Sequence, residues 1–393
     1  ISVGSSSVAW MADVTADGTQ QSSSNEVGIF VWGGSNAFLE GTTTVKGNSS
    51  NGGGINSAGS TVWLDGTIIL DSNKQSLVIE HGGTMGIGNG STTTITNSTS
   101  YGIKAYYGKI WNYGTMTISN NSDGNYAVII DRSEAHLKNM TISGGTGTNP
   151  LVEVWQGQLT LDGATIKDHQ GDLFYADRST LQFRGTNSFT DSSSNRCVVY
   201  FKNTDFYIDG STDDGSTTIN GSNTTGCAAF NLKRSRGEIR NITATGAQEA
   251  LYAATSDVQI KGGTFSSTGQ SGIKVVEGSR FKIRSNNNDI SITSSGDKAL
   301  DVKSSYLKLD KGSKNLTISS TASGAGDIRI RERSTVEIED HTYATVEVSR
   351  ASYLHIDNDA TITTLRCTNS AIILKEGNIT DTSACSTTNH ISD

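Results

Sequence analysis

The sequence predicts an all-β protein folded as a single-stranded parallel β-helix, a solenoid of about 16 coils of about 25 residues each. The first observation is a recurring pattern: two short runs of alternating apolar residues, a polar break between them, and then Gly or Asn. The second is that no segment has the apolar spacing of a helix. The third is that the 393 residues include a single Pro, because a strand paired on both sides cannot lose its N–H.

The segment 250–265, ALYAATSDVQIKGGTF, shows the recurring pattern clearly. Apolar side chains alternate on both sides of the break, as in strands with one buried face. In the segment 127–142, Asn139 stands where Gly262 stands here. Asn tolerates the left-handed backbone conformation better than other residues with a side chain, so a turn explains both. The inward slots of four such segments are Val128, Ile130, Ala135 and Leu137; Val152, Val154, Leu159 and Leu161; Phe174, Ala176, Leu181 and Phe183; and Leu251, Ala253, Val258 and Ile260.

Each repeat of the pattern is interpreted as one coil, lying parallel on the next at about 4.8 Å. Residues of one slot then form ladders, with Leu251 beside Ile273. We predict an N-terminal segment with the first coil over 1–27, a continuous parallel β-helix over 28–380 and a C-terminal tail over 381–393. The coils start near Val8, Gly28, Gly54, Leu77, Tyr101, Tyr126, Leu151, Leu173, Val198, Ala228, Ala250, Gly272, Ala299, Asp327, Ala344 and Ile362.

The four cysteines fall into two pairs, each about one coil apart. Cys197 and Cys227 precede the same slot in successive coils, and Cys367 and Cys385 are separated by 18 positions, close to one coil length at that end. Stacked residues lie at a Cα distance that a disulfide allows, so two disulfides are expected. Buried free thiols are the alternative. Zinc is not expected, because no Cys-x-x-Cys spacing occurs. Two disulfides would imply an oxidising compartment.

The charge balance and the start of the chain limit its partners and its location. A net charge of −8, with KRSRGEIR (233–240) as the most basic segment, gives no patch suited to nucleic acid. We interpret that segment as an exposed strand and turn. No run of 18 apolar residues occurs, so a membrane-spanning chain is not expected. The start at Ile1 fits a secreted product whose signal peptide has been removed, placing it outside the cell or on its surface.

Ten Asn-x-Ser/Thr sequons permit glycan attachment in an exported protein. They are Asn48, Asn89, Asn97, Asn120, Asn139, Asn220, Asn223, Asn241, Asn315 and Asn378. A chain so rich in Ser and Thr also produces sequons by chance.

The best acidic candidate for chemistry is the segment 203–215, NTDFYIDGSTDDG, which contains Asp205 and Asp213. Glycoside hydrolysis needs two carboxylates that flank the scissile bond. The segment resembles polygalacturonases in its Asn-Thr-Asp, but their Gly-His-Gly and Arg-Ile-Lys elements are missing. Turn residues explain its later aspartates better. We therefore predict no catalytic residue, no metal site and no cofactor, and keep Asp205 and Asp213 as surface or ligand contacts.

Aromatic residues gather in the segment 101–114, YGIKAYYGKIWNYG. Its inward slots leave Tyr106, Trp111 and Tyr113 facing outward, where they suit stacking on sugars or a protein interface. A covering loop is the alternative. Later, outward arginines in DIRIRERSTVEIEDH (327–341) precede outward glutamates, as in a solvated strand face or a contact with another subunit.

The pattern resembles that of right-handed parallel β-helix proteins over nearly the whole chain. Such a solenoid needs polar caps, and neither end predicts a capping helix, so irregular loops or a partner would cover the ends. The expected function is an extracellular structural protein that self-assembles into a cell-surface layer, sheath or filament, similar to β-solenoid proteins of microbial cell envelopes such as methanogen sheath proteins. Its partners would be copies of itself. The alternative is a polysaccharide-binding or depolymerising appendage resembling phage tailspikes and adhesins.

Overall fold

The computed structural model describes residues 1–18, 27–48, 53–121, 126–145, 147–190, 196–209, 215–223, 225–286, 288–310, 312, 314–323, 326–386 and 390–392, the last three and residues 120–121 by backbone alone. The chain forms two compact units, Ile1–Ser193 and Ser194–Asp393, which we describe separately. No helix occurs among the described residues, and the strands pair in parallel. The predicted fold class, an all-β parallel solenoid, is confirmed.

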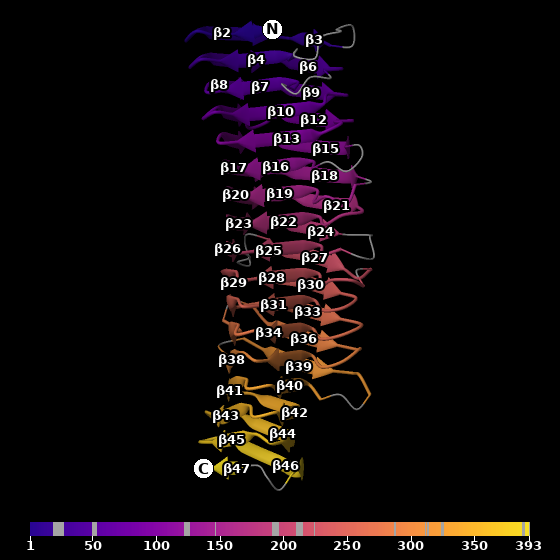
Figure 1. Ribbon diagram of the computed structural model, residues 1–393, viewed down its shortest axis with the longest axis vertical. Helices are drawn as coiled ribbons and strands as arrows, with labels where there is room; N and C mark the ends of the chain where they lie inside the picture. Colours follow the sequence, from indigo (N-terminus) through magenta and orange to yellow (C-terminus); the bar gives the residue numbers. More distant parts are fainter. Residues whose placement is uncertain are drawn as a thin grey trace. The chain divides into compact units, whose positions relative to one another are not determined.

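In the first unit each coil runs from a strand of sheet A to one of sheet B and one of sheet C, and the next coil pairs with it in parallel (Figure 1). Sheet A contains β1 (Ser2–Val3), β4 (Ile29–Trp32), β7 (Ile55–Ala58), β10 (Gln75–Glu80), β13 (Tyr101–Tyr106), β16 (Val128–Asp131), β19 (Val152–Trp155) and β22 (Phe174–Asp177). Sheet B contains β2 (Val8–Ala12), β5 (Asn36–Glu40), β8 (Thr61–Leu64), β11 (Thr84–Ile87), β14 (Lys109–Asn112), β17 (Glu134–Lys138), β20 (Gln158–Asp162) and β23 (Thr180–Arg184). Sheet C contains β3 (Thr15–Asp17), β6 (Thr42–Lys46), β9 (Thr67–Asp71), β12 (Thr92–Thr96), β15 (Thr115–Asn121), β18 (Met140–Gly145), β21 (Thr165–His169) and β24 (Asn187–Thr190).

The second unit repeats the three sheets, but its last coils are shorter. Sheet A contains β25 (Val199–Lys202), β28 (Phe230–Lys233), β31 (Leu251–Ala254), β34 (Ile273–Val276), β37 (Leu300–Lys303), β40 (Ile328–Arg331), β42 (Thr342–Ser349), β44 (Thr361–Thr368) and β46 (Asn378–Cys385). Sheet B contains β26 (Asp205–Ile208), β29 (Arg236–Ile239), β32 (Asp257–Ile260), β35 (Arg280–Arg284), β38 (Tyr306–Asp310), β41 (Thr335–Glu339), β43 (Tyr353–Asp357), β45 (Ala371–Leu374) and β47 (His390–Ser392). Sheet C contains β27 (Thr217–Gly221), β30 (Ile242–Gly246), β33 (Gly263–Ser267), β36 (Ile290–Ser294) and β39 (Leu316–Ser320).

The number of coils differs slightly from the prediction at both ends of the chain. Val8 was predicted to start the first coil. It lies in β2 of sheet B, and the first coil begins earlier, with β1 of sheet A. The segment 381–393, predicted as a tail, contains the end of β46 and all of β47, which pair with the preceding coil. The terminal strands β1 and β47 have only 2 and 3 residues, too few to show an alternating pattern in the sequence.

The core lies inside the coils, where the alternating apolar residues point. All of the inward slots predicted for the four segments are buried. Leu251 lies in register with Ile273, as predicted. In the first unit Phe174, Phe183 and Phe189 pack ring against ring, with centroids 5.4–5.9 Å apart. The period-two pattern therefore identifies the core because adjacent side chains of a strand point to opposite faces.

The turns between strands use left-handed residues. Asn139 has a φ of 46°, close to the 74° and 62° of Gly163 and Gly185 in the same slot of later coils. This confirms the turn at Asn139. In the segment 250–265 the glycine turn has its positive φ on Gly263, at 127°, one position after Gly262.

A ladder of buried hydroxyl groups, which was not predicted from the sequence, lines the turn between sheets A and B. In the second unit it runs through Thr204, Ser235, Ser256, Ser279, Ser305, Ser334 and Ser352. The N–H of Ser256 donates to Oγ of Ser279 at 3.1 Å, and that hydroxyl donates to the carbonyl of Val276 at 2.6 Å. Each hydroxyl thus satisfies a backbone donor of the preceding coil that would otherwise be buried without a partner.

Tyr343, in β42, provides a first test of the core. Its side chain is buried, yet its hydroxyl makes no hydrogen bond, and burial strongly raises the pKa of the phenol. We expect Tyr343→Phe to raise the free energy of unfolding by about 1 kcal/mol, because it removes an unsatisfied buried polar group. Urea unfolding of the two proteins measures the difference. A loss of stability would show that the hydroxyl has a stabilising partner.

Candidate functional site

The three aromatic residues predicted as surface contacts lie in two places on the first unit. Tyr106 ends β13 in sheet A, and its ring meets that of Tyr107 edge to face at a centroid distance of 4.6 Å. Trp111 lies on the outer side of sheet B, because both of its neighbours in β14 are fully buried. Tyr113 follows β14, and its ring centroid lies 5.7 Å from that of His136.

Trp111 belongs to a row of rings on the outer side of sheet B, which we call the aromatic row. Each member lies in register with the next strand's residue. The rings of Trp10 and Phe38 stack with a centroid distance of 4.2 Å. Trp10 is 68% exposed and Trp63 37%. The row consists of Trp10 in β2, Phe38 in β5, Trp63 in β8, Trp111 in β14 and His136 in β17, with Gly86 of β11 at the remaining place.

Gly86 gives the Trp63 indole room to reach over the next coil. A Cβ atom at Gly86 would collide with the six-membered part of the Trp63 indole, so this ring covers the glycine. Gly86 also lies in register with Trp111. The absence of a side chain at one position therefore lets Trp63 lie over the neighbouring coil toward Trp111.

The row carries no formal charge at neutral pH. Burial lowers the pKa of His136, helped by Arg184 and Lys138 and opposed by Asp162. The imidazole of His136 is therefore uncharged at neutral pH. Four members of the row were not predicted from the sequence as surface contacts, because each lies in a different coil: Trp10, Phe38, Trp63 and His136. One feature of the sequence could have identified them: each stands between the two inward-facing residues of the second strand of its coil.

A polar groove of about 350 Å³ lies beside the row, where sheet B begins. Tyr107 and Arg132 form one wall: Nη1 of Arg132 donates to the Tyr107 hydroxyl at 2.6 Å, and its Nε donates to Oε1 of Gln156 at 2.9 Å. Lys109 and Glu134, whose charged atoms are 3.1 Å apart, form the other wall. Lys109 and Glu134 each lie two residues before a member of the aromatic row in the same strand. The groove and the row are therefore on the same face of sheet B.

Of the two acidic residues predicted as contacts in the second unit, the structure describes Asp205. Asp205 is exposed and lies 3.4 Å from Arg236 on the outer side of sheet B. Arg236 is in register with Asp257, and Asp257 with Arg280, so Asp205 begins a ladder of alternating charge. Asp213 lies outside the described residues. A second groove, of about 270 Å³, lies between Asp257, Arg280, Tyr306 and their neighbours.

The outward arginines of β40 contact an acid of their own unit. Asp301 of β37 is buried and accepts hydrogen bonds from Arg329 and Arg331, with closest distances of 2.9 Å to each. Burial opposes ionisation of Asp301, but the two arginines outweigh it, so the pKa of this carboxyl lies below its usual range. Glu337 and Glu339 of β41 both lie within 4.0 Å of Lys308. These charges therefore join neighbouring coils.

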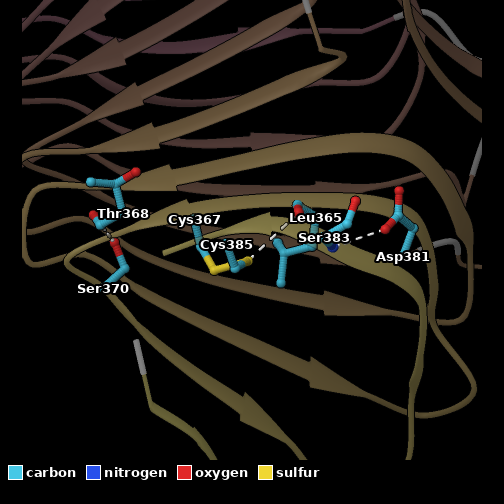
Figure 2. Close-up of a disulfide and its surroundings, with 7 residues drawn as sticks. All are labelled: Leu365, Cys367, Thr368, Ser370, Asp381, Ser383 and Cys385. Carbon is cyan, nitrogen blue, oxygen red and sulfur yellow. Dashed lines mark hydrogen bonds between the residues drawn. A yellow bond between two sulfur atoms is a disulfide. The ribbon is translucent and has the colours of Figure 1, made fainter. Parts of the chain in front are cut away.

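Both predicted disulfides are present, and each joins two successive coils. Cys197 and Cys227 precede β25 and β28, with Cα atoms 5.0 Å apart. Cys367 and Cys385 lie in register in β44 and β46, with Cα atoms 4.4 Å apart (Figure 2). Cys367 occupies an inward slot and is almost fully buried. Two such bonds are characteristic of proteins that fold in an oxidising compartment.

The sequons differ in access. Asn48 is buried, and its Nδ2 donates to Oδ1 of Asn73 at 2.9 Å, so the folded chain gives no access to it. The side chain of Asn120 lies outside the described residues. Asn220 and Asn241 are half-buried. The exposed sequons are Asn89, Asn97, Asn139, Asn223, Asn315 and Asn378.

Over the described part of the chain, no three His, Cys, Asp or Glu side chains are placed to hold a metal ion. Within the same residues no helix has the length and apolar character needed to cross a membrane. No protein-family model, no curated protein and no solved structure matches the chain.

Proposed function

We propose that the protein is an extracellular structural protein that assembles with copies of itself into a cell-surface layer, sheath or filament. The observation that carries this proposal is that both disulfides and a buried ion-pair network join one coil to the next. In this network Asp301 accepts hydrogen bonds from Arg329 and Arg331. Such cross-links oppose the separation of coils under load, which a structural protein requires.

The two disulfides support an exported location, because they persist outside the cell and are rare in the cytosol. The exposed sequons are compatible with the same location, since glycan attachment needs accessible Asn side chains. Both observations favour a protein of the cell surface over a cytosolic one.

Exposed apolar side chains support contact with other copies. Nine of the ten exposed large apolar side chains among the described residues belong to the first unit, and we place the contact on its sheet A. Trp32 and Trp155 occupy the outer side of sheet A and are 42% and 43% exposed. Large apolar side chains in water mark surfaces that bind other molecules.

Electron microscopy of the purified protein with and without a thiol reductant tests the proposal. We expect ordered tubes, sheets or fibres that loosen when the disulfides are reduced. A variant with all four cysteines replaced by Ala is the control for effects of the reductant itself, and its assemblies should not respond to it. Discrete monomers or small oligomers in every condition would contradict self-assembly.

A polysaccharide-binding appendage is the second candidate, because the aromatic row and the polar groove share one face of the first unit. Of the two acidic residues predicted as contacts, Asp205 pairs with Arg236, and Asp213 lies outside the described residues.

A further inference from the structure

We propose that the outer side of sheet B in the first unit binds a neutral polysaccharide, with sugar rings on the aromatic row and hydroxyl groups in the polar groove. This site does not depend on self-assembly. It is carried by the register of the rings, the glycine beneath Trp63 and the hydrogen-bonding groups of the groove.

The residues of the aromatic row occupy one position in successive coils, so the distance between coils sets the spacing of their backbone positions. Successive coils are about 4.8 Å apart, so the backbone positions of Trp63 and Trp111, two coils apart, are separated by about 9.6 Å along the sheet, and the Trp63 indole reaches over the coil between them. This is comparable with the disaccharide repeat of an extended β-linked glycan. An indole face presents negative charge density to the C–H groups on the flat side of a pyranose. Trp63 and Trp111 can therefore hold sugars of one chain, whereas the rings of Trp10 and Phe38 stack on each other.

Gly86 favours a flat ligand over a protein side chain. Because the Trp63 indole occupies the place that a Cβ atom of Gly86 would take, the ring leans over the neighbouring coil and does not stand straight out from the sheet. A ring that stood straight out would suit insertion into a pocket of another protein, whereas a ring that leans over the sheet suits stacking. The backbone of Gly86 is not in the left-handed region, so its conformation does not require glycine. The space that it leaves for the indole remains the physical reason for glycine at this position.

The polar groove favours a hydroxyl-rich ligand without charge. Lys109 is paired with Glu134 at 3.1 Å. Arg132 is engaged by the Tyr107 hydroxyl and by Gln156. These charges are balanced or hydrogen-bonded on the protein, so the groove has no free cation for an anionic chain. Exposed Gln158 adds an amide donor and acceptor to the lining.

Affinity electrophoresis of the full chain tests the site, in native gels that contain hydroxyethyl cellulose, xylan or the anionic glycan alginate. We expect retardation by at least one of the two neutral glycans and not by alginate. Trp63→Ala and Trp111→Ala should each weaken binding about tenfold, the change expected for losing one ring contact. The matched control is Trp155→Ala, which removes an equally exposed tryptophan from sheet A and should leave retardation unchanged.

Gly86→Val tests the arrangement without removing a ring. Its side chain would displace the Trp63 indole, so binding should weaken as in Trp63→Ala. Thermal unfolding of each variant checks that the fold is retained. No retardation in either neutral gel, retardation by alginate alone, or unchanged binding in Trp63→Ala and Trp111→Ala would overturn the proposal. So would loss of self-association in these two variants, because that result assigns the row to a second copy.

Discussion

Asp301→Ala is expected to lower the free energy of unfolding by about 3–5 kcal/mol, the loss typical of breaking a buried ion pair. The carboxylate is 1% exposed and accepts hydrogen bonds from both Arg329 and Arg331. Its removal leaves two guanidinium groups close together with less of the negative charge that balances them, since Asp297 contacts Arg329 alone. Urea unfolding of the full chain, followed by circular dichroism, measures the loss.

The matched control is Asp205→Ala, because Asp205 also pairs with an arginine of the next coil but is exposed. An exposed pair contributes about 0–1 kcal/mol, so this variant should be close to wild type. Equal losses in the two variants would contradict the assignment of a buried network to Asp301.

The contribution of Asp301 should also depend on pH in a defined direction. Its pKa is lowered below the ordinary 3.8, because the hydrogen bonds from the two arginines outweigh burial. A depressed folded-state pKa stabilises the protein fully above the ordinary pKa and loses this effect as pH falls through the folded-state value. The difference in unfolding free energy between wild type and Asp301→Ala should therefore be constant from about pH 7 to about pH 5 and shrink below about pH 3.8. A difference that grows on acidification would refute this sign.

Removal of either disulfide is expected to lower the free energy of unfolding by about 3–4 kcal/mol, because each bond restricts the unfolded chain. The bonded residues are separated by 30 positions in one pair and by 18 in the other. The variants are Cys197→Ala with Cys227→Ala, and Cys367→Ala with Cys385→Ala. Alanine is used because a serine hydroxyl at the buried position 367 would add an unsatisfied polar group.

Urea unfolding of each double variant, with and without reductant, separates the two bonds. Reductant should lower the stability of each double variant by the contribution of its remaining disulfide. It should not change a variant without cysteines. If the wild type and the double variants unfold at the same urea concentration, the disulfides do not stabilise the fold.

Much of the fold could be predicted because the in-and-out alternation of a strand is local. Val128 and Ile130 face the core in the structure as the sequence predicts, and Asn139 adopts the left-handed turn expected of it. The pairing of Cys367 with Cys385 also followed from spacing, since positions one coil apart lie side by side in parallel strands.

The candidate site was only partly predictable. Trp111 was identified as outward-facing, but the indole of Trp63 over Gly86 depends on which residues of different coils lie in register. Asn48 was named among the possible glycan attachment sites, yet it is buried beside Asn73 of the next coil. Both contacts join residues of neighbouring coils. The loop between the coils sets which of these residues meet.

The sequence by itself determined the strands, their inward faces, most of the turns and the cysteine pairs, because these follow from side-chain alternation and from the recurrence of the strand pattern in every coil. Only the tertiary structure decided which outward residues meet. Asp301 stands between two inward apolar residues and has the sequence position of a solvated side chain, yet Arg329 and Arg331 of the next coil bury it. The physical reason is that outward side chains have no common hydrophobic driving force. Their partners are fixed by the register between coils, and the loops of variable length set that register.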